Sequence, residues 1–327
     1  MFNSLFDKSI LVNSVWKMGT SLLDDDFINI VSNRLDDQKI NIVDFSSEHW
    51  GDSLSAYNQL ADSSKKFIYL THNEADHLSL PNYLYFPHHY FGENHLILPQ
   101  PNAINTINKK YKISCLNGNP HVHRIYNLLL LKDKPYFNDL LFTFHNTDEP
   151  WRSDSPELSQ EMKSEWERIR SSYNNRGGRE TFFLPNGENS HPAFSDSYIN
   201  LITETSVNPK VFITEKTWKS IATGQLFILL GNQGSIQHLR NLGVDTFDDY
   251  IDHSYYDNEP NWQQRINKIH DLVDYFMSLD NSKLQQINQE TYQRRLTNSE
   301  NYFSGRFVSK YINCLREKIN ELNQNVL

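Results

Sequence analysis

The sequence has few cysteines, no long apolar run and no excess of basic residues, and each of these features argues against a class of protein. The only two cysteines, Cys115 and Cys314, are not spaced as zinc ligands are, which argues against both a disulfide framework and a zinc site. No stretch reaches the length of a transmembrane helix, and the N-terminus lacks the apolar core and basic flank of a signal peptide. We therefore expect a cytoplasmic protein without a transmembrane segment.

The charge balance bears on the partners of the protein. A net charge of −9 makes the whole molecule repel polyanions, which weighs against nucleic acid as a partner. Short basic clusters at 109–112 and 176–179 are still able to bind phosphate. No Gly-x-Gly-x-x-Gly follows a predicted strand, so a dinucleotide-binding oxidoreductase is the least favoured α/β enzyme.

Apolar runs of strand length alternate with helical patterns along all 327 residues, which is typical of α/β folds with parallel sheets. Strands are predicted at 8–12, 40–45, 67–70, 111–116, 139–144, 198–203, 226–230 and 244–247. Helices are predicted at 20–35, 121–131, 214–223, 235–242, 261–279, 282–296 and 307–322, with a further one starting near 155. This order predicts two Rossmann-like domains, at 1–100 and 111–305, joined by a linker at 101–110. A polar insertion spans about 146–194, and the C-terminal helix within 306–327 has an apolar stripe on one side that is expected to bridge back to the first domain.

The most informative stretch runs from residue 198 to residue 231. An apolar strand leads into Glu204, Thr214 is a predicted helix N-cap, and Gly224 occupies the position of a C-cap glycine before the next strand. Ligands of open α/β sheets bind beyond the carboxyl ends of the strands, where Glu204 and Thr214-Glu215-Lys216 are expected. A helix N-terminus and a lysine both attract anions. The pattern predicts a pocket for a nucleotide diphosphate sugar, although a capped helix with surface charges fits the same residues.

This stretch resembles the donor-binding segment of the alpha-1,3-fucosyltransferases, a family with the GT-B fold of two Rossmann-like domains facing a central cleft. The matching segments are Thr203-Glu204-Thr205, Ile213-Thr214-Glu215-Lys216 and Ile228-Leu229-Leu230-Gly231, although Thr205 stands where the family has Asn. Residues 111–131 are similar to the start of the family's second domain, in which a strand, a turn and an early helical arginine occur in this order. The resemblance implies donor-binding roles for Asn117, Arg124, Glu204, Thr214, Glu215 and Lys216.

A transferase that joins a sugar to a hydroxyl needs a base to take the hydroxyl proton. Glu48 and His49 follow one predicted strand, and His72, Glu74 and Asp76 follow the next. In the family, the base is an N-terminal carboxylate upstream of a segment similar to residues 83–90. The resemblance therefore favours Glu74 as the base, with Asp76 second and Glu48 third, although each of them also fits a plain surface carboxylate.

These features together predict an inverting, metal-independent glycosyltransferase with no cofactor besides its nucleotide-sugar donor. The donor would be GDP-fucose-like or another nucleotide diphosphate sugar, and the acceptor a hydroxyl of a glycan. Arg124 and Lys216 would stabilise the diphosphate leaving group. Two alternatives remain open: a glycosyltransferase acting on hydroxymethylated bases in DNA, and a non-catalytic nucleotide-sugar or glycan-binding protein on the same fold.

Overall fold

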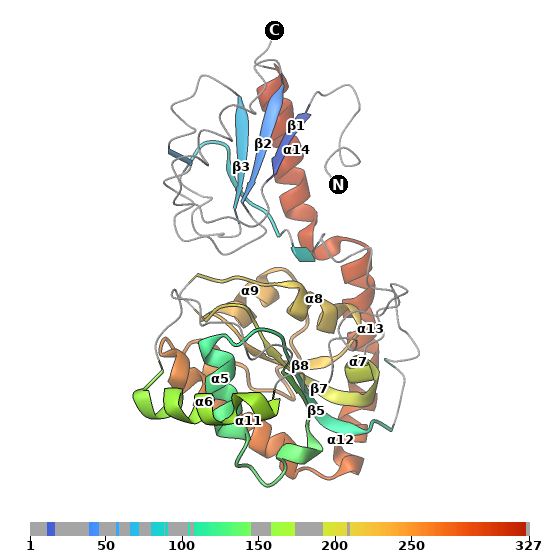
Figure 1. Ribbon diagram of the computed structural model, residues 1–327. Coiled ribbons are helices and arrows are strands. Elements are labelled where there is room, and N and C mark those ends of the chain that lie inside the picture. The colour runs from blue at the N-terminus through green and yellow to red at the C-terminus, as the bar shows by residue number, and fades with distance from the viewer. Residues whose placement is uncertain are drawn as a thin grey trace. The chain divides into compact units, whose positions relative to one another are not determined.

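The structure is a computed structural model in which the chain forms two compact units (Figure 1). One unit comprises residues 1–88 and 308–327, and the other comprises residues 89–307. The described residues of each unit contain a four-stranded parallel sheet, which confirms the predicted α/β class with parallel strands. The structure describes residues 12–16, 39–45, 57–58, 66–71, 80–87, 89–90, 104, 108–144, 158–173, 192–207 and 210–324.

In the first unit the strands follow one another across the sheet in chain order. They are β1 (Val12–Trp16), β2 (Ile40–Phe45), β3 (Phe67–Thr71) and β4 (Tyr83–Tyr85). β2 has the predicted bounds and β3 is one residue longer than predicted, whereas β1 shares only Val12 with the predicted strand at 8–12. β4 was not predicted, and it pairs with β3 so that Tyr83 stacks on Tyr69 at a centroid distance of 5.1 Å.

The last helix, α14 (Ser309–Gln324), belongs to the first unit. The ring of Tyr311 packs edge-on against Tyr85 of β4, with centroids 4.7 Å apart. Near the other end of the helix, Lys66 Nζ donates a hydrogen bond to the carbonyl of Leu322, 3.1 Å away. A cation at the C-terminal turn of a helix also stabilises the helix dipole. The apolar stripe predicted for this helix therefore packs on the first sheet.

The second sheet has the strand order β6-β5-β7-β8, and all its strands are parallel. The strands are β5 (Tyr111–Asn117), β6 (Leu141–Phe144), β7 (Ser197–Thr203) and β8 (Leu226–Leu230). Every residue of β7 and of the edge strand β8 is buried, as expected of parallel strands whose two faces are covered, and this explains their continuous apolar sequences. β6 starts two residues later than predicted because Phe137–Asp139 forms a 3-10 turn.

The connections of this sheet run in two directions. α5 (Val122–Leu131) leads from β5 to one edge, and α8 (Glu215–Ala222) leads from β7 toward the other edge. Because such crossovers are right-handed, the two helices cover opposite faces. Figure 1 shows α5 with α11 (Trp262–Ser278) on one side, and α8 with α13 (Tyr292–Phe303) on the other. The strand order thus reverses between β5 and β7, and their carboxyl ends form the switch point at which ligands of such sheets bind.

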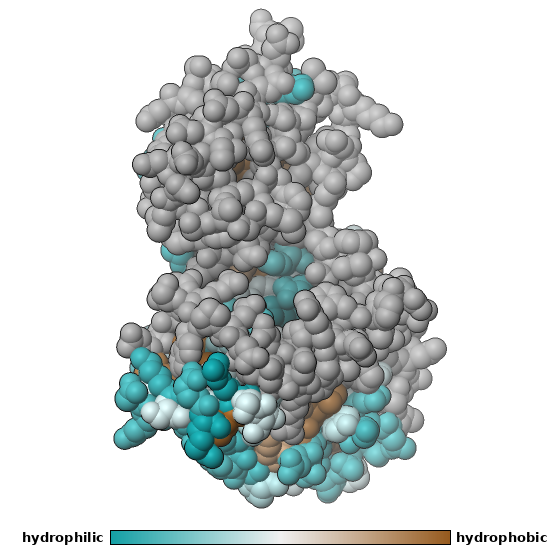
Figure 2. Space-filling view, viewed as in Figure 1, coloured by the Kyte–Doolittle hydropathy of each residue, from teal (hydrophilic) through white to brown (hydrophobic). Residues whose placement is uncertain are grey.

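The remaining helices of the second unit are short or amphipathic. In α6 (Gln160–Tyr173), Trp166 and Ile169 are buried, and the outer side of the helix is hydrophilic (Figure 2). The helix predicted at 282–296 is two helices that meet at Thr291, whose hydroxyl donates to the carbonyl of Ile287 at 2.8 Å. The others are α7 (Pro192–Asp196), α9 (Ser235–Asn241), α10 (Ser254–Asp257), α12 (Asn281–Glu290) and the 3-10 turn Arg306–Val308.

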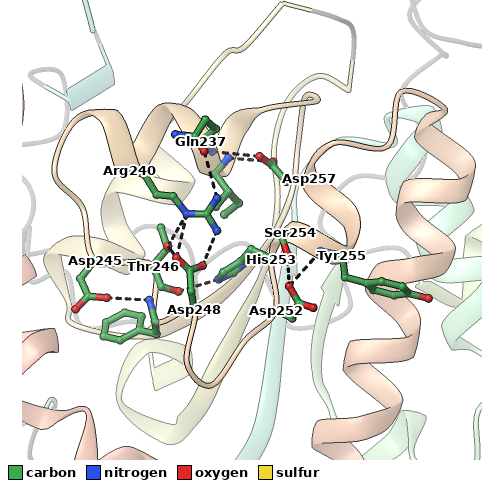
Figure 3. Close-up of polar contacts among 12 residues, drawn as sticks. Gln237, Arg240, Asp245, Thr246, Asp248, Asp252, His253, Ser254, Tyr255 and Asp257 are labelled. Atoms are coloured by element: carbon green, nitrogen blue, oxygen red, sulfur yellow. Dashed lines mark hydrogen bonds and ion pairs between the residues drawn. The ribbon is translucent and has the colours of Figure 1, made fainter.

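The edge strand predicted at 244–247 is wrong, because this segment is a loop held by side chains (Figure 3). The carboxylate of Asp245 accepts from the backbone N–H of Phe247 at 2.9 Å, and Phe247 has a φ of 61°, which no strand residue adopts. Tyr256 reaches the sheet instead: its hydroxyl accepts from the backbone N–H of Leu229 in β8 at 3.1 Å. His253 links that hydroxyl to the carbonyl of Thr246 with contacts of 2.7 and 2.8 Å.

Candidate functional site: the carboxyl edge of the second sheet

All six predicted donor-binding residues lie at the carboxyl ends of β5 and β7, and one chain of hydrogen bonds connects them. The chain of bonds starts at Asn117, the last residue of β5, whose side-chain oxygen accepts from the hydroxyl of Thr203 in β7 at 2.7 Å. The amide of Asn117 also donates to the carbonyl of Thr143 in β6 at 3.2 Å. Asn117 is fully buried, so its side chain ties three strand ends together beneath the surface.

Arg124 is the next member of this chain of bonds, and it is 2% exposed. Its guanidinium donates to the carbonyls of Thr203 and Glu204 at 3.0 and 3.1 Å, and to that of Asn119 at 3.2 Å. These bonds hold the turn after β5 against the end of β7. The sequence prediction directed this side chain at donor phosphates, whereas the structure places its positive charge beneath the edge of the sheet.

Glu204 is fully buried and caps α8 from another segment of the chain. Its carboxylate accepts from the backbone N–H of Thr214 at 3.0 Å, from the Thr217 hydroxyl at 2.6 Å and from the Thr214 hydroxyl. Thr214 is the N-cap residue as predicted, but its hydroxyl donates to Glu204 and makes no bond to the helix backbone. The bonds of this carboxylate therefore stabilise the start of α8, whereas the resemblance implied a donor-binding role for it.

Lys216 and Glu215 form the part of the site that solvent reaches. Lys216 Nζ donates to the hydroxyls of Thr205 and Thr214 at 3.1 and 3.0 Å, and to the Glu215 carboxylate at 2.8 Å. About a quarter of each side chain is exposed, at 26% for Lys216 and 25% for Glu215. Burial alone would raise the pKa of Glu215, but the neighbouring cations, first Lys216 and then His89 and Lys219, hold this pKa well below its usual range.

His89 also belongs to this site, although the sequence analysis assigned it to the first domain and to no role at the donor site. Its Nδ1 lies 3.5 Å from the second carboxylate oxygen of Glu215. Its neighbour Tyr90 is fully buried and packs edge-on against Trp218, at 5.0 Å and one turn along α8 from Glu215. No local pattern pairs residue 89 with α8, because the two are far apart in the sequence. The one feature of the sequence that points to a buried position here is the aromatic residue Tyr90, next to His89.

Two further buried side chains support the same edge. Arg265, on α11, is 2% exposed and donates to the carbonyls of Gly231 at 3.2 Å and Val207 at 3.1 Å, so it holds together the segments that follow β8 and β7. His123 contacts the Glu204 carbonyl through Nε2 at 2.7 Å. Burial, followed by the charge of Arg124, lowers the pKa of His123 to about 3, so this ring is neutral and donates through Nε2.

The helices that begin at this edge differ at their N-termini. At α9 the carboxylate of Asp257 accepts from the backbone N–H groups of Ile236 and Gln237 at 3.0 and 3.1 Å (Figure 3). A carboxylate of the protein therefore already occupies the N-terminus of α9. In contrast, α5 begins after His121 with no side-chain cap and no acidic residue in its first turn.

The candidates for the catalytic base, Glu74, Asp76 and Glu48 together with His49 and His72, lie outside the described residues. Within the part of the chain that is described, no group of three or more His, Cys, Asp or Glu side chains is arranged to hold a metal ion. The helices in the same described ranges are all too short or too polar to span a bilayer.

Comparison with known proteins finds no relative of this chain. No family model matches the chain, and neither a curated protein nor a solved structure matches it. The functional argument therefore depends on the parallel sheet, the contacts at its carboxyl edge and the motif Ile213-Thr214-Glu215-Lys216.

Proposed function

We propose that the second unit binds a nucleotide diphosphate sugar at the carboxyl edge of its sheet, and that the protein is a glycosyltransferase acting on a hydroxyl of a glycan. The observation that carries the proposal is the bonded network between β5 and β7. Six residues chosen from the sequence as donor ligands meet there, although they come from three separate segments. They meet at the switch point of a parallel sheet, which is where this architecture binds ligands.

The charges at this edge suit a diphosphate. The start of α5 presents the positive end of a helix dipole. Lys216 lies at the end of β7 with a quarter of its side chain exposed, and Arg124 and Arg265 add positive charge from beneath. During sugar transfer, negative charge grows on the diphosphate as its bond to the sugar carbon breaks. Cations held in place beforehand stabilise that charge without rearrangement.

The proposed reaction is a single displacement. The acceptor oxygen forms its bond to the sugar carbon on the face opposite the leaving diphosphate, which inverts that carbon. The hydroxyl proton passes to a carboxylate, for which Glu74 and then Asp76 are our candidates. The electron pair of the broken bond stays on the diphosphate, next to Lys216.

The binding step can be tested by thermal shift with GDP, UDP, CDP, ADP and dTDP, each with Mg²⁺ and with EDTA. A ligand of the folded state raises its stability with the logarithm of ligand concentration over Kd. We expect one diphosphate to raise the melting temperature in both conditions. We expect Lys216→Ala to weaken its binding by about tenfold or more, because an interaction with a charged group contributes roughly 1.5–3 kcal/mol.

Lys283→Ala is the matched control, because Lys283 is an exposed lysine of α12 whose ammonium group bonds only to the side chain of Gln286 among the contacts described. This variant should bind as the wild type does. Equal affinity in Lys216→Ala and Lys283→Ala, or no shift with any nucleotide, would contradict the proposal. Binding of a nucleotide sugar without transfer to any glycan, in a protein with intact Glu74 and Asp76, would instead indicate a non-catalytic binding protein.

A further inference from the structure

We propose that His89 is a positioning residue of this site, which in its protonated form shares the Glu215 carboxylate with Lys216 and thereby strengthens the binding of an anionic ligand. The identity of the ligand rests on the function proposed above. The contact itself does not depend on that function, because it is a property of the protein without a ligand.

The imidazole is held in place from two sides. Tyr90, the next residue, contacts Trp218 at 5.0 Å and Tyr302 at 4.7 Å, and its hydroxyl donates to the carbonyl of Tyr302. The ring of His89 packs edge-on against Phe212, with centroids 5.4 Å apart. Because its neighbours are fixed, the His89 side chain already lies beside Glu215. It therefore loses little conformational entropy when it pairs with that carboxylate.

The charges around His89 determine the direction of the effect. From α8 it faces Glu215, with Lys216 and Lys219 behind that carboxylate, and from the preceding loop it faces the uncharged Phe212. With a neutral His89, the charges of Glu215 and Lys216 cancel. With a protonated His89, the same three side chains carry one net positive charge. An anion next to Lys216 is therefore bound more tightly when the imidazole is charged.

Linkage makes this a measurable pH dependence. Affinity for a diphosphate should be high below the pKa of His89 and should fall as the pH rises through it. Across the full titration we expect a change of about tenfold, the size of effect that one partly exposed charge pair produces. The phosphates of the ligand also titrate, but their contribution is the same for every variant and cancels in the ratio of affinities.

The test is isothermal titration calorimetry at pH 6, 7 and 8 with the nucleoside diphosphate that raises the melting temperature. Wild type, His89→Gln and the control Lys283→Gln are compared. Glutamine keeps a hydrogen-bonding group of similar length and carries no charge. The affinities are first corrected for the titration of the ligand phosphates, which is the same for every variant. After this correction, we expect His89→Gln to bind the diphosphate at pH 6 as weakly as the wild type does at pH 8. We expect Lys283→Gln, which removes one exposed charge on α12 outside the proposed site, to keep the wild-type pH profile.

An unchanged pH profile in His89→Gln, or its loss in Lys283→Gln, would overturn the proposal. A second arm needs no ligand: NMR titration of the His89 ring in wild type and in Glu215→Gln. Removing the carboxylate charge should lower the pKa of His89. If no nucleotide binds any variant, the proposed function fails, and this titration still decides whether His89 is coupled to Glu215. Equal His89 titration in both proteins would refute the coupling, and equal circular dichroism spectra would show that both are folded.

Discussion

Helices α8 and α9 both begin at the carboxyl edge of the second sheet, and the N-terminus of each is capped by a carboxylate from elsewhere in the chain. Glu204 caps α8, and Asp257 caps α9. They differ in what surrounds the cap. Beside α8, Lys216, Glu215 and His89 remain between 22% and 26% exposed. Beside α9, the Gly234 N–H donates to the Asp257 carbonyl at 3.0 Å, and Arg240 is paired with Asp248 at 2.6 Å.

The comparison shows that a carboxylate from elsewhere in the chain can cap a helix in two ways. At α8 the buried carboxylate bonds the N-cap residue Thr214 and the Thr217 hydroxyl, and Lys216 lies outside it with about a quarter of its side chain exposed. At α9 the cap itself uses the backbone N–H groups of Ile236 and Gln237, which an anion would need, and Arg240 is paired with Asp248 much as Lys216 is paired with Glu215. The same device thus stabilises both helices, and the two helix starts differ in which groups the carboxylate occupies, not in how exposed their cations are.

The largest effect should come from acid, because buried neutral histidines support both sides of this comparison. Burial lowers the pKa of His123, below Glu204, to about 3, and that of His253, beside α9, to about 4. Both lie below the usual value of 6.5, so the unfolded chain binds more protons and stability is lost as the pH falls from 6.5 toward 4. Each should cost about 2 kcal/mol at pH 5, measured as the change in unfolding free energy in urea relative to pH 7.

A pH-independent unfolding free energy between pH 7 and pH 5 would contradict this assignment. His270 should add to the effect, because burial also lowers its pKa to about 4. The imidazole signals of all three rings should stay those of the neutral form at pH 6 in NMR spectra of the folded protein.

The second prediction concerns a variant that removes the cap of α8 and leaves that of α9 intact. Glu204→Ala removes the acceptor of three buried donors, so the unfolding free energy should fall by about 3–5 kcal/mol. Urea unfolding measures the loss, and hydrogen exchange should show faster opening of α8 than of α9. Asp133→Ala is the control, because this carboxylate is 76% exposed and should matter by less than about 0.5 kcal/mol. Equal effects of the two variants would mean that Glu204 does not cap α8.

The third prediction concerns a variant that removes the cap of α9, with a smaller expected loss of unfolding free energy. Asp257→Ala leaves two backbone N–H groups at the start of α9 without their acceptor, and should cost about 1–2 kcal/mol. Nucleotide affinity should stay within about twofold of wild type, because the proposed site lies at α5 and α8. A loss of affinity as large as that of Lys216→Ala would move the site to α9.

Much of the second unit was predictable because its signals are local. The apolar run at 226–230 has the bounds of β8, and the helix predicted from Thr214 starts one residue later. The edge strand at 244–247 was not predictable in the same way. Its residues have a strand-like apolar pattern, but Asn298 bonds the backbone of Asp245 at 3.0 and 2.8 Å from a distant helix. Such tertiary bonds override a weak local propensity.

The candidate site divides along the same line. Its residues were identifiable because strand ends, helix starts and the charged residues next to them are all indicated by short, local sequence patterns. The direction in which each side chain points was not, since Glu204 turns to Thr217, Arg124 to the carbonyl of Thr203, and His89 to Glu215. Short-range order sets strands, helices and the edge at which they end. The contacts that separate a buried support from an accessible charge join distant segments, and they exist only once the sheet has formed.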